Sequence, residues 1–145
     1  MLTKCTKSLI TAYKSTLQHL LNTLLLNQKN LNKNMSELEQ LETLVTQVRR
    51  DILRQVHKVN SGHPGGSLGC TEFLVALFKE IMDRQDEFTM DGKDEDIFFL
   101  SNGHISPVFY SVLAHSGYFP VEELNTFRLL NSRLQGHPTT HEGLP

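Results

Sequence analysis

"NSGHPGGSLG", residues 60–69, places a histidine between a glycine and a proline, with two further glycines behind it. Glycine has no Cβ atom, so a ligand can approach the backbone of such a loop closely. The imidazole of His63 can donate or accept a hydrogen bond and can exchange a proton near neutral pH. Pro64 fixes one backbone dihedral and so restrains the loop. The stretch therefore predicts a rigid, ligand-contacting loop.

Glycine–histidine pairs recur twice more along the chain, as Gly103-His104 and Gly136-His137. With seven histidines and nine glycines among 145 residues, chance would supply fewer than one such pair. Proline follows His137 as it follows His63, so two of the three loops are restrained in the same way. The repetition favours a functional role for the three histidines over a merely structural one.

The second pair lies between two predicted elements. "IFFL" at 97–100 is short, continuous and apolar, which is typical of a parallel strand buried on both faces. "SPVFYSVLAHSGY", at 106–118, follows the pair and predicts a helix. Ligands of open α/β sheets bind beyond the carboxyl ends of strands, and helix N-termini attract phosphate. We therefore expect His104 to bind a phosphorylated cofactor or substrate.

The rest of the chain reads as helices joined by polar segments. Ser36 and Glu39 fit a capping box that would start a helix, and apolar residues then recur at helical spacing from 38 to 59. Further helices are predicted at 68–82 and from Pro120 to about 130. The order of elements indicates an α/β fold, a parallel sheet flanked by helices. Only one strand is apparent, so this part is mostly helical and the sheet must be completed by other residues.

Composition separates the first 34 residues from the remainder. They contain five lysines and no acidic residue, whereas all sixteen acidic residues follow Met35. We predict that 1–34 is an extension, translated from upstream sequence or forming a weak membrane-surface helix, and that the domain occupies 35–145. The net charge of −2 does not favour nucleic acid as a partner, and no stretch is long and apolar enough to span a membrane. Cys5 and Cys70 give no disulfide framework, which suits a cytoplasmic protein.

"NSGHPGGSLG", "FFLSNGH" and "LNSRLQGHP" together resemble the successive motifs of the amino-terminal, diphosphate-binding part of transketolase. The resemblance covers about residues 38–145 and is strongest to the amino-terminal subunit of split bacterial transketolases. It implies a thiamine-diphosphate-binding fold and transfer of a two-carbon ketol unit between sugar phosphates. It also implies an oligomer with a carboxyl-terminal subunit that carries the pyrimidine-binding domain.

Site roles follow from the same resemblance. His63 matches the histidine that contacts substrate and cofactor and shuttles protons, and His137 matches one that hydrogen-bonds the substrate near the reacting carbons. His104 matches the histidine that meets the cofactor diphosphate, and Gly66 matches a position close to the cofactor. The cofactors would be thiamine diphosphate and Mg²⁺. The family's metal ligands would lie beyond Pro145, so no metal ligand is expected within the chain, which alone would be inactive.

Three alternatives remain. A truncated, non-catalytic relic or interaction module would keep the same loops. A deoxyxylulose phosphate synthase would share the cofactor but lacks the second and third motifs in this form. A small zinc protein could use His137, His141 and Glu142, because His-x₃-His spacing suits that metal.

Overall fold

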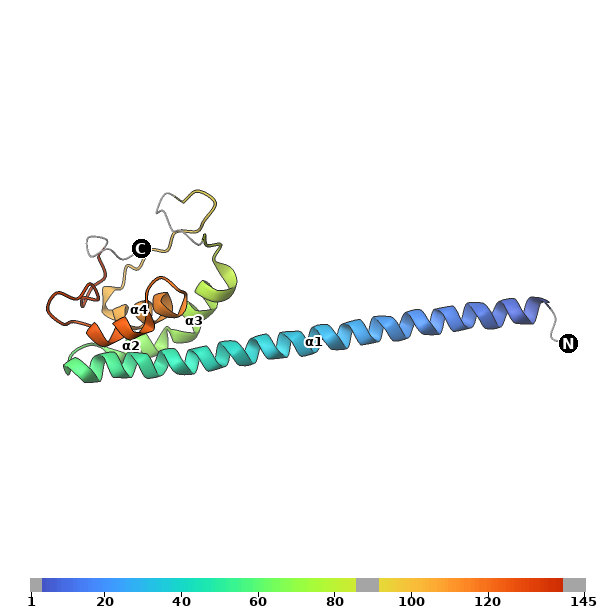
Figure 1. Ribbon diagram of the computed structural model, residues 1–145, viewed down its shortest axis with the longest axis horizontal. Coiled ribbons are helices and arrows are strands. Elements are labelled where there is room, and N and C mark those ends of the chain that lie inside the picture. The colour runs from blue at the N-terminus through green and yellow to red at the C-terminus, as the bar shows by residue number, and fades with distance from the viewer. Residues whose placement is uncertain (1–3, 86–91, 140–145) are drawn as a thin grey trace. The chain divides into compact units, whose positions relative to one another are not determined.

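The computed structural model describes residues 4–85 and 92–139, with side chains described at Ser15 and from Leu17 onward. Its chain divides into two compact units, Met1–Gln40 and Leu41–Pro145. All the short helices lie in the second unit (Figure 1).

The first helix, α1 (Lys4–Val59), does not begin at the predicted capping box. It runs through Ser36 and Glu39, so the prediction that Ser36 starts the helix is wrong. Residues 1–35 contain no glycine or proline that would interrupt a helix, and a Ser-x-x-Glu pattern is equally compatible with a helix interior. The division into an extension of 34 residues and a domain stays a prediction.

The predicted end of α1 is confirmed. Asn60 takes a positive φ of 49°, a conformation common just beyond the end of a helix. The backbone N–H of Ser61 then donates to the Val56 carbonyl at 3.2 Å and so caps the last turn. The glycine loop thus starts directly at the end of α1.

The second helical segment begins earlier than predicted, inside the glycine loop. Pro64 is the first residue of α2 (Pro64–Gly69), a position that suits proline because the N–H there has no partner within the helix. The segment then continues as α3 (Thr71–Ala76) and as the π-helical turn η1 (Leu77–Ile81). His63 therefore precedes a helix directly.

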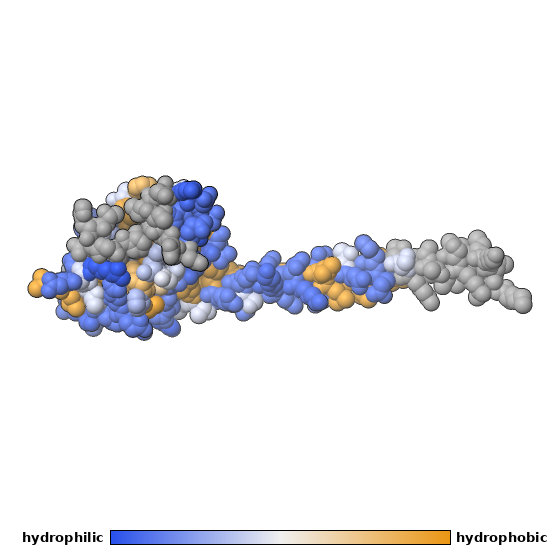
Figure 2. Space-filling model, turned by 45° about the horizontal axis from the view of Figure 1, so that its top comes forward, coloured by the Kyte–Doolittle hydropathy of each residue, from blue (hydrophilic) through white to orange (hydrophobic). Residues whose placement is uncertain are grey.

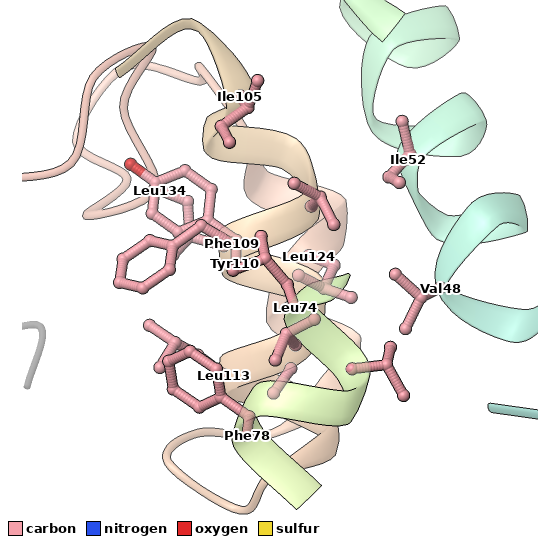
Figure 3. Packing of buried hydrophobic residues seen from close by; sticks show 14 of the residues in the cluster. Val48, Ile52, Leu74, Phe78, Ile105, Phe109, Tyr110, Leu113, Leu124 and Leu134 are labelled. Carbon is pink, nitrogen blue, oxygen red and sulfur yellow. The ribbon is translucent and has the colours of Figure 1, made fainter. Parts of the chain in front are cut away.

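Helix α4 (Ser106–His115) is the centre of the second unit and confirms the helix predicted from "SPVFYSVLAHSGY". Each of its residues from Ser106 to Ala114 is buried. A helix that is buried on all sides must be covered by several elements. Figure 3 shows this core, in which Val48 and Ile52 of α1 point toward the segment that carries Leu74.

The predicted strand at 97–100 is not formed. These residues are irregular, and no strand occurs within residues 4–85 and 92–139. Phe98 packs its ring against Phe78 and Phe109, at centroid distances of 5.2 and 5.7 Å, whereas Phe99 is 83% exposed. An extended segment needs a neighbour to share backbone hydrogen bonds, and the described residues offer none. The parallel sheet stays a prediction.

The last predicted helix is shorter than expected. Pro120 does precede a helical segment, but this is the 3₁₀-helix η3 (Val121–Thr126), not a helix that reaches 130. Arg128 and Asn131 take positive φ values of 57° and 66°, which end regular helical structure. The other 3₁₀-helix, η2 (Gly103–Ile105), leads directly into α4.

Candidate functional site: a row of three histidines

The three glycine–histidine loops converge. The ring of His104 lies between those of His63 and His137, at centroid distances of 5.2 Å and 5.1 Å. The ring planes are nearly perpendicular at both contacts, at 81° and 77°. We call these three residues the histidine row. It joins segments that are far apart in the sequence.

The local backbone structure positions each of the three histidines. His63 has φ −119° and ψ 87°, in keeping with the restriction that Pro64 places on the residue before it. His104 is the middle residue of η2, just ahead of α4. His137 lies in the irregular segment after η3 and is followed by Pro138. The row is therefore carried by two helix starts and one loop.

Glycine is required where the second and third loops meet. A Cβ atom on Gly103 would lie 2.2 Å from Cδ2 of His137, far inside van der Waals contact. Gly66 has a related role, since its Cβ would lie 3.0 Å from Cγ2 of Ile105, the residue after His104. These two glycines let the loops approach one another.

Helix α4 anchors the third loop. The hydroxyl of Ser106 donates a hydrogen bond to the Gly136 carbonyl, and the hydroxyl of the buried Tyr110 donates to the Gln135 carbonyl, both at 2.7 Å. Ser106 and Tyr110 lie one turn apart on the helix. Together they hold the backbone just before His137.

Arg128 is a neighbour of the site that sequence reasoning missed. Its guanidinium donates to the Ser61 hydroxyl, lies 5.4 Å from the ring centroid of Phe127, and lines the space where a Gly136 side chain would be. It thereby connects the first and third loops. No pattern in the sequence marks this arginine, because its hydrogen-bond partner Ser61 lies far away along the chain.

Gln55 was also missed, although the sequence holds a signal for it. This glutamine is buried on the core-facing side of α1, one turn after the buried Asp51. Its amide donates to the Pro107 carbonyl at 3.1 Å and to the Ser111 hydroxyl at 2.8 Å. A polar residue at core spacing indicates a buried hydrogen-bond partner, and here the partners lie in the first two turns of α4.

All three imidazoles of the histidine row are exposed. Within the described part of the chain, none of their ring nitrogens forms a hydrogen bond, so these atoms can bind a ligand. Neutral imidazole offers one donor and one acceptor, and the protonated ring offers two donors. Three such rings in a row suit a polar, oxygen-rich ligand that carries both hydroxyls and negative charge.

Another histidine, His115, belongs to a separate polar contact. Its Nε2 lies 2.9 Å from Oδ2 of Asp51, whose other carboxylate oxygen accepts hydrogen bonds from Gln47 and Arg54. Burial alone would raise the pKa of Asp51, but these hydrogen bonds outweigh it and hold the pKa below its ordinary value. The contact joins α1 to the end of α4.

The zinc alternative finds no support among the residues that the structure places. Across residues 4–85 and 92–139, no three His, Cys, Asp or Glu side chains are arranged to hold a metal ion. His141 and Glu142 lie outside these residues. The described helices also include none that is long and apolar enough to cross a membrane.

Residues 41–144, and with them the whole histidine row, match the family described as "Transketolase, thiamine diphosphate binding domain". Among curated proteins, the chain is 38% identical over 100 residues to the transketolase of Buchnera aphidicola. It is 38% identical over 96 residues to transketolase 2 of Escherichia coli and 42% identical over 84 residues to transketolase 2 of Xanthobacter flavus.

Each match covers about two thirds of the present chain but only a small part of the relative. The Buchnera match takes in 68% of the present chain but 15% of the relative, and the Escherichia coli match takes in 66% and 14%. The chain thus spans about one seventh of the length of the curated relatives it matches.

Proposed function

Because the chain belongs to the transketolase thiamine-diphosphate-binding family, we propose that its histidine row forms one wall of a site for thiamine diphosphate and sugar phosphates. The observation that carries this proposal is the convergence of His63, His104 and His137, with ring centroids 5.2 and 5.1 Å apart. A stable core does not require three imidazoles from three loops to lie together at an exposed position. Their convergence therefore supports a binding site.

The residues present fit a diphosphate and a polyhydroxylated substrate. His104 stands just ahead of the N-terminus of α4, where backbone N–H groups and the helix dipole favour negative charge. Gly103 and Gly66 keep the loops close and free of side chains. In the proposal, His104 hydrogen-bonds the diphosphate and Gly66 belongs to the backbone beside the cofactor.

The remaining roles concern protons and orientation. Bound thiamine diphosphate would supply the nucleophilic carbon for transfer of a two-carbon ketol unit. His63, exposed at the start of α2, would contact substrate and cofactor and move protons at the donor hydroxyls. His137, held by the anchored third loop, would hydrogen-bond the substrate near the reacting carbons.

The proposed site needs further parts. The cation that neutralises the diphosphate would be Mg²⁺, held by ligands from outside this chain. A carboxyl-terminal subunit with the pyrimidine-binding domain would supply the opposite wall, within a cytoplasmic oligomer. The chain alone is therefore expected to be inactive.

Complementation tests the proposal. The chain would be co-expressed with the part of the Escherichia coli transketolase that the match does not cover, and ketol transfer would be measured. His104→Ala should raise the thiamine diphosphate concentration needed for half-maximal activity about ten- to a hundredfold, since a hydrogen bond to a charged group is lost. His63→Ala should lower kcat/KM for the donor sugar with that concentration nearly unchanged.

His57→Ala is the matched control, because His57 is an exposed histidine of α1 outside the row. It should leave both quantities unchanged. Absence of ketol transfer in the wild-type assembly would contradict the enzyme proposal and favour a non-catalytic role. Equal effects of the His57 and His104 changes would contradict the assignment of the site.

A further inference from the structure

The exposed part of α1 carries a regular apolar stripe that the histidine row does not use. Between positions 17 and 38 it has seven residues, and the spacing from one to the next is alternately four and three. Six of the seven are apolar. We call this stripe the α1 seam; it consists of Leu17, Leu21, Leu24, Gln28, Leu31, Met35 and Leu38. Alternating spacings of four and three are the pattern of a coiled-coil contact.

The apolar members of the α1 seam are open to solvent. Their exposed fractions run from 48% at Leu17 to 65% at Leu24. Figure 2 shows hydrophobic surface interrupting the hydrophilic surface of this helix. A helix of 22 residues is about 33 Å long, so the stripe is an extended surface and not an isolated apolar side chain. Such a surface is stable in water when another helix covers it.

The charges of this segment avoid the seam. Lys29, Lys33 and Glu37 occupy outer helical positions, and Lys33 pairs with Glu37 at 3.6 Å on the same helix. The positions that flank the seam between 17 and 38 are Gln18, Leu20, Leu25, Asn27, Asn32 and Asn34. None of these side chains is charged, so two copies of the helix could approach without like-charge repulsion.

Gln28 selects the partner. In the middle of an apolar contact its amide needs a group that both donates and accepts a hydrogen bond. A second copy of the same helix, parallel and in register, places Gln28 opposite Gln28 and satisfies both amides. An antiparallel copy would set it against leucine, and lipid would leave it unpaired. Leu17, Leu24, Leu31 and Leu38 recur at one seam position of every heptad, and a single polar residue at the other position, Gln28, specifies register and oligomer state.

We propose that the α1 seam is an interface between two copies of this chain, which associate as a parallel, in-register pair of helices. The inference is independent of the proposed enzymatic function, because no member of the histidine row takes part. The partner is a second identical chain, and the contact is made by residues 17–38.

Light scattering after size exclusion tests association of the full chain. We expect twice the chain mass of 16.5 kDa for the wild type. Leu24→Asp should raise the dissociation constant at least about a hundredfold, because two leucines leave the seam and two carboxylates replace them. Leu26→Asp is the matched control: Leu26 is 61% exposed but lies off the seam, so the dimer should persist. Circular dichroism verifies that each variant keeps its helix content.

Cross-linking tests the orientation. In a chain carrying Cys5→Ser and Cys70→Ser, a Leu21→Cys variant treated with diamide should form a disulfide-linked dimer, and a Leu26→Cys variant should not. A monomeric wild type, a dimer that survives Leu24→Asp, or cross-linking at 26 in preference to 21 would overturn the proposal. A monomer that binds phosphatidylserine vesicles through Leu24 would also overturn it and identify the stripe as a membrane contact.

Discussion

Gly103 lies against the ring of His137, and a larger residue fits there only if that ring moves. The third loop can reach the second because this backbone carries only hydrogen at the point of contact. Ser106 and Tyr110 then hold the third loop from the other side through its carbonyls. The position of His137 thus depends on residues that would not themselves touch a ligand.

Gly103→Ala should displace His137 while leaving the fold intact. His137 is exposed and its ring can swing aside, so we expect a loss of stability below about 1 kcal/mol. Nuclear magnetic resonance of the imidazole protons should show loss of the contact between His104 and His137. Gly65→Ala is the control, since a Cβ there meets nothing within 4 Å. Unchanged imidazole signals in Gly103→Ala would contradict the packing described.

At this scale the sequence predicted the members of the histidine row better than it predicted how they are held. The repeated glycine–histidine pairs identified the members of the row, because the same chemical pair recurs in the sequence. The roles of Arg128 and of Gly103 could not be predicted from the sequence. Each depends on a contact with a residue many positions away, and local pattern holds no information about such contacts.

Between elements, the contact of Asp51 with His115 predicts a pH dependence of stability. The pKa of Asp51 is held below its ordinary value of 3.8 in the folded chain. The ionised carboxylate therefore stabilises the fold above that value, and the stabilisation is lost as the pH falls through the lowered pKa. Acid should loosen the link between α1 and the end of α4.

Asp51→Asn tests this link. At about pH 6 we expect urea unfolding to show a loss of about 1–3 kcal/mol relative to the wild type, and at about pH 2.5 a smaller difference. Glu72→Gln is the control: Glu72 also pairs with an arginine, Arg49, but the pair is exposed and should contribute little. A difference that is the same at both pH values would refute the role of the charge.

Among elements, the helices were predictable and their boundaries less so. Apolar residues at helical spacing predict the second half of α1, because one face of that segment is buried. The start of α1 was misplaced since a capping pattern can also occur inside a helix. "IFFL" was expected as a strand because it is continuous and apolar. Pairing depends on a neighbouring strand, however, and local sequence does not reveal whether one is present.

For the whole molecule, the two compact units predict that the second folds without most of the first. A chain beginning at Met35 should unfold within about 3 °C of the full chain, because Val48 is the first buried residue among the described side chains of α1. It should also lose the self-association assigned to the α1 seam. Differential scanning calorimetry and light scattering measure the two effects.

A chain beginning at Arg49 is the control for this deletion. It lacks Val48, which is fully buried, and should be less stable by roughly 1–3 kcal/mol or more. If the chain beginning at Met35 were destabilised as strongly as this control, residues before Met35 would be part of the second unit's fold.

The spacing of the histidine row along the chain has a consequence for folding kinetics. His63, His104 and His137 are neighbours only after two long loops have closed. Closing these loops lowers the conformational entropy of the chain before any stabilising contact has formed. The anchors of the third loop lie on the buried helix α4, so the rings can meet only once that helix has its neighbours. The ring-current shifts of the imidazole protons should therefore appear with the same rate constant as burial of the core. A partly folded chain would show neither, and its histidines would have the signals of free imidazole.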